Sequence, residues 1–77
     1  MGFGDDPVGD ERLQTAAAAH YDVMADVHDT AAMGHERRGE RADAKRERAL
    51  ARDARGKAKR LRDQVRVSQA LRRSDGA

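Results

Sequence analysis

The chain has 77 residues, of which 39% are charged and 38% apolar, and it contains no cysteine. This composition excludes disulfide frameworks and cysteine-based metal or nucleophile sites, and no apolar run approaches the roughly 20 residues of a bilayer-spanning helix. The net charge of +2 conceals two opposed halves, because residues 1–36 hold eight carboxylates and one arginine, whereas residues 37–73 hold fifteen bases and five acids.

Residues 1–9 are predicted to form a flexible N-terminal lead, since they contain three glycines, one proline and two aspartates. They have neither the positive region nor the apolar run of a secretory signal, so we expect a cytoplasmic protein. An acidic helix over about 10–33 should follow, with Asp10 as its N-cap. Asp6 before Pro7 offers an earlier start one turn upstream.

The apolar residues of this first helix recur at steps of four and three, which is the spacing of a coiled-coil seam. Its share of the predicted helix-pairing seam consists of Leu13, Ala17, His20, Met24, Val27 and Ala31. Carboxylates occupy the opposite side of the same helix, at Asp22, Asp26 and Asp29. We therefore expect an amphipathic helix with an acidic polar side.

Two glycines, Gly34 and Gly39, bracket the point at which the apolar pattern changes phase. On one uninterrupted helix, the apolar residues of the second half would lie about 160° around from the first seam. Gly34 is suited to terminate a helix, so we predict a turn over residues 34–39 and a helical hairpin. The alternative is a continuous rod of about 95 Å that dimerises in antiparallel fashion. Substantial disorder in the tail is the third arrangement that the sequence leaves open.

A basic helix over about 40–71 is predicted next, with residues 74–77 as a frayed tail. Its share of the helix-pairing seam consists of Leu50, Ala54, Leu61 and Val65. Nine bases at alternating three- and four-residue steps share one face of this helix, and we call them the basic stripe. They are Arg38, Arg41, Lys45, Arg48, Arg52, Arg55, Lys59, Arg62 and Arg66.

The basic stripe admits two interpretations, because bases outnumber acids three to one over residues 37–73. Either the acidic helix neutralises it, within one chain or between two copies, or an external polyanion does. Arginine suits phosphate because its planar guanidinium binds bidentately. The aromatic residues, Phe3 and Tyr21, lie outside the basic region. Any nucleic-acid binding would therefore involve the backbone and be largely independent of sequence.

A short heptad repeat runs through the middle of the chain. The pairs His28-Asp29, His35-Glu36 and Ala42-Asp43 recur at seven-residue intervals, and Ala25, Ala32 and Gly39 precede them by three residues. Over roughly residues 16–55 the chain resembles a loose set of small actinobacterial proteins built from Ala-x-x-His-Asp/Glu heptads followed by an Arg/Glu-rich tail. The resemblance implies a helical fold and no established activity.

The histidines and paired carboxylates do not predict a catalytic or metal site. A chelating pair on one helix needs a spacing of three or four residues, whereas His28 and His35 are seven apart, and His20 and His28 are eight apart. Acidic neighbours such as Asp22 and Asp26 have no apolar pocket that would shift their pKa values. We expect no metal, no cofactor and no enzymatic activity, and we expect His20 to set the register of the seam.

These observations predict an all-α protein, either a two-helix hairpin or a long helix or coiled coil, that self-associates because large apolar side chains are too few for a monomeric globule. The expected function is a small non-catalytic helical interaction protein in which acidic and basic helices pair, with a second copy or another protein as partner. The alternative is a sequence-independent nucleic-acid or ribosome-associated protein that places the basic stripe on phosphates. Neither a membrane nor a small-molecule substrate is expected as a partner.

Overall fold

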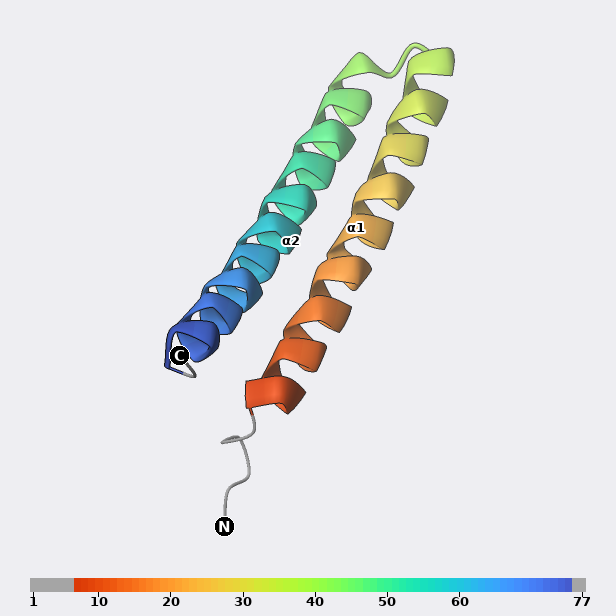
Figure 1. Cartoon of the computed structure of the whole chain (residues 1–77). Coiled ribbons are helices and arrows are strands. Elements are labelled where there is room, and N and C mark those ends of the chain that lie inside the picture. Colours follow the sequence, from red (N-terminus) through yellow and green to blue (C-terminus); the bar gives the residue numbers. More distant parts are fainter. Residues whose placement is uncertain (1–6, 76–77) are drawn as a thin grey trace.

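Two long helices and a short turn make up the described part of the chain (Figure 1). The structure, a computed structural model, describes residues 7–75. Helix α1 spans Pro7–Arg37, and helix α2 spans Arg41–Asp75. They pack antiparallel against each other and measure 57 × 25 × 13 Å. The structure confirms the all-α hairpin and excludes the continuous rod of about 95 Å.

The turn between the helices is a Schellman motif closed by Gly39. Gly39 has a φ of 76°, and its N–H donates to the carbonyl of Glu36 at 3.0 Å. The N–H of Glu40 donates to the carbonyl of His35 at 2.8 Å, which completes the motif. Gly34, the predicted terminator, instead lies inside α1. Gly39 ends the helix because its φ is in the left-handed region, where glycine alone avoids a steric penalty.

Both helices are longer than the sequence predicts. α1 begins a turn early, at Pro7, because proline at the first helical position has a helical φ and lacks an N–H that would need a partner. α2 also ends later than expected, so residues 7–9 and 74–75 are helical. The remainder of the predicted lead and tail, residues 1–6 and 76–77, together with the early N-cap, lies outside the described residues.

The core between the helices consists of alanine. Among the described residues, every buried apolar side chain is an alanine with at most 7% exposure, and no large side chain is fully buried. The buried alanines recur mainly at seven-residue intervals: Ala18, Ala25 and Ala32 on α1, and Ala44, Ala51, Ala54 and Ala58 on α2. Tyr21 packs against Ala25, Ala51 and Ala54. A heptad repeat of small side chains lets two backbones approach closely, and this explains the antiparallel coiled coil.

The predicted seam on α1 is displaced by one residue from the observed one. Leu13 and Val27 are 71% and 61% exposed, and Met24 is 38% exposed. The buried and half-buried row follows each predicted position by one residue: Gln14, Ala18, Tyr21, Ala25, His28 and Ala32. The prediction favoured large apolar side chains, but helices this close together accommodate methyl groups between them.

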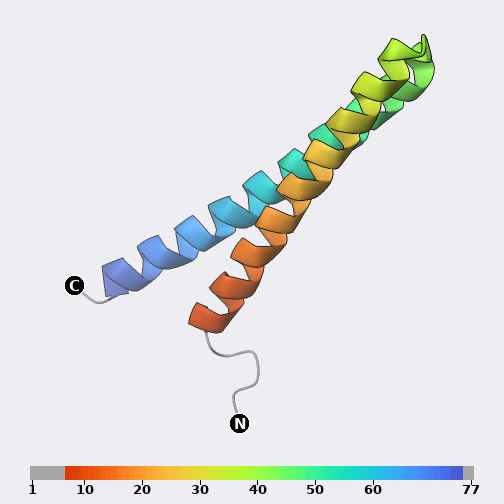
Figure 2. The same cartoon turned by 90° about the vertical axis from the view of Figure 1, so that its right-hand side faces the viewer.

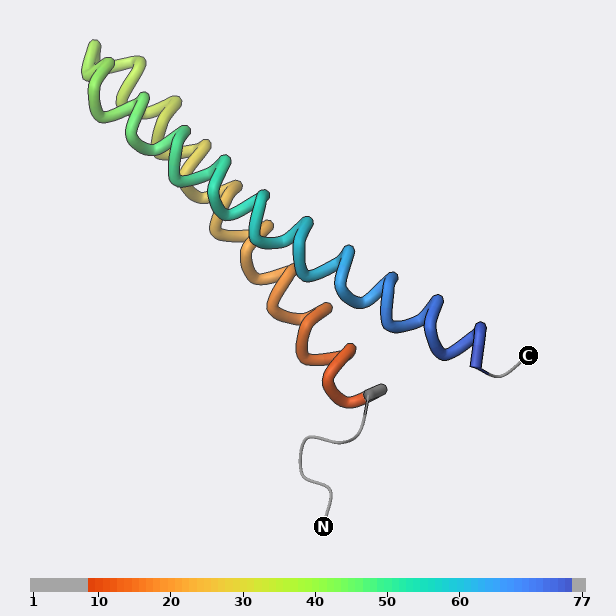
Figure 3. The backbone as a smooth tube through the Cα atoms, turned by 90° about the vertical axis from the view of Figure 1, so that its left-hand side faces the viewer, coloured from red at the N-terminus to blue at the C-terminus, as the bar shows by residue number. Residues whose placement is uncertain are grey.

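On α2 the predicted seam agrees better with the structure. Ala54 is buried, and Leu61 and Val65 are half-buried between the helices, whereas Leu50 lies at the edge with 43% exposure. Viewed from the side, the two helices overlap near the turn and separate toward their free ends (Figure 2, Figure 3). Leu61 and Val65 lie in the half of α2 that leads to its free end, whereas Ala44, Ala51 and Ala54 lie in the half that follows the turn.

Candidate functional site

Three cross-helix ion pairs follow one edge of the hairpin at seven-residue intervals on both helices, and we call them the charge ladder. Each joins an acid of α1 to an arginine of α2: Asp22 with Arg62, Asp29 with Arg55, and Glu36 with Arg48. All six side chains are 38–49% exposed. The opposite charges of the two helices thus find partners within one chain.

Hydrogen bonds within the charge ladder favour the ionised forms of Glu36 and of the three arginines. The hydrogen bond from Arg48 holds the pKa of Glu36 below its ordinary value of 4.5, and the same bond raises the pKa of Arg48. The hydrogen bond to Asp29 likewise raises the pKa of Arg55, and the hydrogen bond to Asp22 raises the pKa of Arg62. These bonds join α1 to α2 at three successive heptads of each helix.

A further cross-helix pair joins the free ends of the helices. Glu11 is only 8% exposed and accepts two hydrogen bonds from Arg72, one of them 2.9 Å long between Nη2 and Oε2. Glu11 lies one heptad before Ala18, and Arg72 lies two heptads after Ala58, so the pair continues the alanine rows. Its bidentate geometry closes the seam where the alanine core ends. This pair is not predicted from the sequence. The signal that would have predicted it is the spacing of Glu11 and Arg72 from the buried alanines, which is a multiple of seven residues.

The basic stripe is divided by the fold into three groups. The charge ladder contains three of its nine bases. Three more contact carboxylates of the turn or of their own helix: Arg38 contacts Glu40, and Lys59 and Arg66 contact Asp63. The remaining three have no carboxylate within ion-pair distance among residues 7–75: Arg41, Lys45 and Arg52. The stripe is therefore neither wholly neutralised nor wholly free.

The opposite edge of the hairpin carries large apolar side chains. Six residues that are 38–71% exposed lie on this side, and we call them the apolar face: Leu13, Met24 and Val27 on α1, and Leu50, Val67 and Leu71 on α2. A hollow of about 150 Å³ lies between Met24 and Leu50, and the ring of Tyr21 lines it. Lys57 Nζ lies 5.5 Å from the centroid of that ring, a cation–π contact.

A polar contact crosses the seam beside the apolar face. His28 Nδ1 lies 2.6 Å from Glu47 Oε2, and both side chains are partly buried. His20, which the sequence predicts to be the register-setting histidine, is exposed instead. Because the observed seam lies one residue later than the predicted one, the histidine that contacts the other helix is His28.

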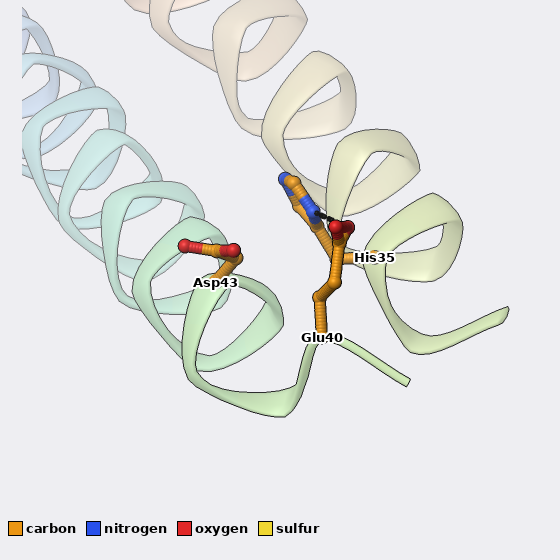
Figure 4. Close-up of side chains that lie close together, drawn as sticks. All are labelled: His35, Glu40 and Asp43. Atoms are coloured by element: carbon orange, nitrogen blue, oxygen red, sulfur yellow. Dashed lines mark hydrogen bonds and ion pairs between the residues drawn. The ribbon is translucent and has the colours of Figure 1, made fainter. Parts of the chain in front are cut away.

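A cluster at the turn brings together His35, Glu40 and Asp43, whose ligand atoms lie within 4.8 Å of one another (Figure 4). Nδ1 of His35 lies 2.8 Å from Oε1 of Glu40, and the Nε of Arg38 donates to the same oxygen at 2.8 Å. These contacts lower the pKa of Glu40, with the hydrogen bond to His35 as the largest cause. Sequence reasoning considers histidine pairs within one helix and so misses this cluster across the turn. One nitrogen and two carboxylates can ligate a divalent cation. The guanidinium of Arg38, however, binds the same Glu40 oxygen and would repel such a cation. We therefore interpret the cluster as a set of hydrogen bonds that stabilise the turn.

The fold and these surfaces define the chain as an antiparallel two-helix coiled-coil hairpin with an alanine core, a charged edge and an apolar edge. Neither helix in the described part of the chain is long and apolar enough to cross a membrane. No protein-family model, curated protein or solved structure matches the chain. The resemblance to small actinobacterial helical proteins stays a prediction, and the function is inferred from the surfaces alone.

Proposed function

We propose that the protein is a small non-catalytic helical interaction protein whose hairpin associates with a second copy through the apolar face. One observation carries the proposal: the buried core is made of alanine, while eight large apolar side chains of the described residues are 38–71% exposed. A methyl group buries far less apolar area than leucine or methionine, so the isolated hairpin gains little from the hydrophobic effect. Small scaffolds with such cores commonly gain stability by oligomerisation.

The distribution of charge favours a second copy of the chain as the partner that covers the apolar face. Two hairpins that meet through their apolar faces would form a four-helix bundle with a twofold axis. The charge ladder lies on the opposite edge, so this association leaves it in water and avoids a desolvation penalty. The hollow between Met24 and Leu50 is also lined by Asp53 and Lys57. Each copy therefore offers one acid and one base beside the apolar contact, which is the self-complementary pattern that a twofold interface requires.

Light scattering on the full chain over a range of protein concentrations tests this proposal. The wild type should reach twice its chain mass of 8.5 kDa. The double substitution Met24→Glu with Leu50→Glu should remain at the single mass at the same concentrations, because it places charges at the centre of the apolar face. Circular dichroism should show that both proteins are helical.

The matched control is Val23→Glu with Met33→Glu, which makes the same charge change at exposed apolar residues outside the apolar face. This control should keep the dimer mass. If the wild type stays at the single mass at every concentration, the proposal that a second copy covers the apolar face is wrong. Equal loss of the dimer in both double variants would show that net charge, and not the apolar face, governs association.

A further inference from the structure

A basic groove lies at the turn end of the hairpin. It has a volume of about 460 Å³, and four of its six lining residues are bases: Arg41, Lys45, Arg48 and Arg52. The buried Ala44 also lines it, and Glu36 near the end of α1 is its one acid. The bases come from the first three turns of α2, where steps of three and four residues keep them on one side of the helix.

The charges in this groove are only partly compensated. Glu36 binds Arg48, and the hydrogen bond lowers the pKa of the acid, so this pair is ionised and held in place. Arg41, Lys45 and Arg52 are exposed and form no ion pair among residues 7–75. The groove therefore presents three uncompensated positive charges around a fixed arginine.

We propose that the basic groove binds the phosphate backbone of a nucleic acid. The guanidinium groups of Arg41 and Arg52 can each bind a phosphate bidentately, and Lys45 adds a point charge between them. Arg48 is already oriented by Glu36, so it loses little conformational freedom when a phosphate enters.

A row of bases leads away from the groove along α2 and points to an extended ligand. The row consists of residues at successive seven-residue steps: Lys45, Arg52, Lys59, Arg66 and Arg73. All five are exposed, and each step advances about 10.5 Å along the helix. Lys59 and Arg66 also contact Asp63, so their charges are partly compensated. A ligand with regularly repeated charges matches such a row, whereas an isolated phosphate would occupy the groove alone. The row contains no aromatic residue, so the contacts are to the backbone and not to the bases.

The position of the apolar face disfavours an acidic membrane as the ligand. Leu50 lies about 140° around α2 from Lys45, at about 100° per residue. A surface helix binds a bilayer by inserting apolar side chains beside its basic ones. A membrane that contacts the groove would leave the apolar face in water, so the nucleic acid is the favoured ligand.

Fluorescence anisotropy with a labelled mixed-sequence DNA duplex and a single-stranded RNA, over a salt series, tests the proposal. The full wild-type chain should bind at low salt, with an affinity that falls steeply as salt rises. The triple substitution Arg41→Gln, Lys45→Gln and Arg52→Gln should weaken binding by about tenfold or more at low salt. It should also reduce the slope of log K against log salt by about 2 to 3, because three phosphate contacts are lost.

The matched control is the triple substitution Arg12→Gln, Arg37→Gln and Arg60→Gln, which removes the same charge from exposed residues outside the groove that form no ion pair among residues 7–75. This control should retain the wild-type salt slope. Equal losses in slope for the two triple variants would mean diffuse charge attraction and overturn the groove. Failure of the wild type to bind either nucleic acid at low salt overturns the proposal outright.

Two further ligands separate the sources of phosphate. Inorganic phosphate should not displace the labelled nucleic acid at concentrations matched in total phosphate, and complete displacement would overturn the extended ligand. Vesicles of acidic and of neutral phospholipid should bind more weakly than the nucleic acid, and tighter binding to the acidic vesicles would assign the groove to membranes instead. None of these readouts depends on the apolar face, so a monomeric wild type would leave this inference standing.

Discussion

The turn of the hairpin depends on one backbone angle. Gly39 has a φ of 76°, a region in which the Cβ of an L-residue comes too close to its own backbone. The space around it is open, since an added Cβ would meet nothing within 4 Å, so its constraint is purely conformational. Gly34 lies inside α1, where an added Cβ would make an ordinary 3.5 Å contact with Nη1 of Arg38. Glycine is therefore required by the backbone conformation at position 39, whereas an alanine would fit at position 34.

Alanine substitutions at these two glycines should change stability in opposite directions. Gly39→Ala should lower the free energy of unfolding by about 1 kcal/mol, because alanine must adopt a left-handed φ. Gly34→Ala should raise it by about 0.5–1 kcal/mol, because alanine loses less backbone entropy in a helix. Urea unfolding followed by circular dichroism measures both. A stabilising Gly39→Ala would mean that the turn does not require its positive φ.

At the scale of the helices, the sequence predicts the pairing of an acidic with a basic helix, and also the seam residues Ala54, Leu61 and Val65. It places the seam of α1 one residue too early, because size is a poor guide to burial when two helices pack on methyl groups. The alanines at seven-residue spacing, such as Ala25 and Ala32, are the better signal.

The same displacement explains what the sequence could not resolve about the charges. One residue corresponds to about 100° around a helix, so the displaced seam moves Asp22 and Asp29 from the far side of α1 to the border of its contact with α2. Arg55 faces Asp29 across the seam, while Arg52, three residues earlier, forms no ion pair within residues 7–75. Periodicity alone places both arginines on one stripe, and the packing of the two helices is needed to separate them.

Enlarging a core alanine tests the packing of the helices directly. Ala51→Leu should lower the free energy of unfolding by about 1–3 kcal/mol, because the larger side chain forces the backbones apart. Ala49→Leu, two residues away on the exposed side of α2, is the control and should change stability by less than about 0.5 kcal/mol. Thermal and urea unfolding give both values. Equal effects of the two substitutions would contradict a tightly packed alanine core.

At the scale of the whole molecule, three kinds of surface occupy different parts of the hairpin. Ion pairs follow one edge, apolar side chains occupy the other, and uncompensated bases gather at the turn. This separation allows self-association and anion binding to use different residues. It also makes the hairpin itself dependent on carboxylates that must stay ionised to bind arginine and lysine.

Acid should therefore destabilise the hairpin, and the pKa shifts fix the direction. The pKa of Glu36 is lowered by its hydrogen bond to Arg48, that of Glu40 chiefly by His35, and that of Asp63 chiefly by Lys59. A carboxyl whose pKa is lowered by folding stabilises the folded state. This contribution is complete at pH values above the pKa of the unfolded chain, here 4.5 for the glutamates and 3.8 for the aspartate. It is lost as the pH falls through the lowered pKa of the folded state.

The melting temperature should be constant from neutral pH down to about 5 as far as these carboxyls determine it, and should then fall as the medium becomes more acidic. The variant Glu36→Gln with Glu40→Gln should melt lower than the wild type at neutral pH and show a shallower decline in acid, since two of the titrating groups are gone. Circular dichroism melts at a series of pH values compare the two proteins. A wild type that becomes more stable on acidification would contradict the ionised pairs, because protonation would then remove repulsion between carboxylates and not their attraction to histidine, lysine and arginine.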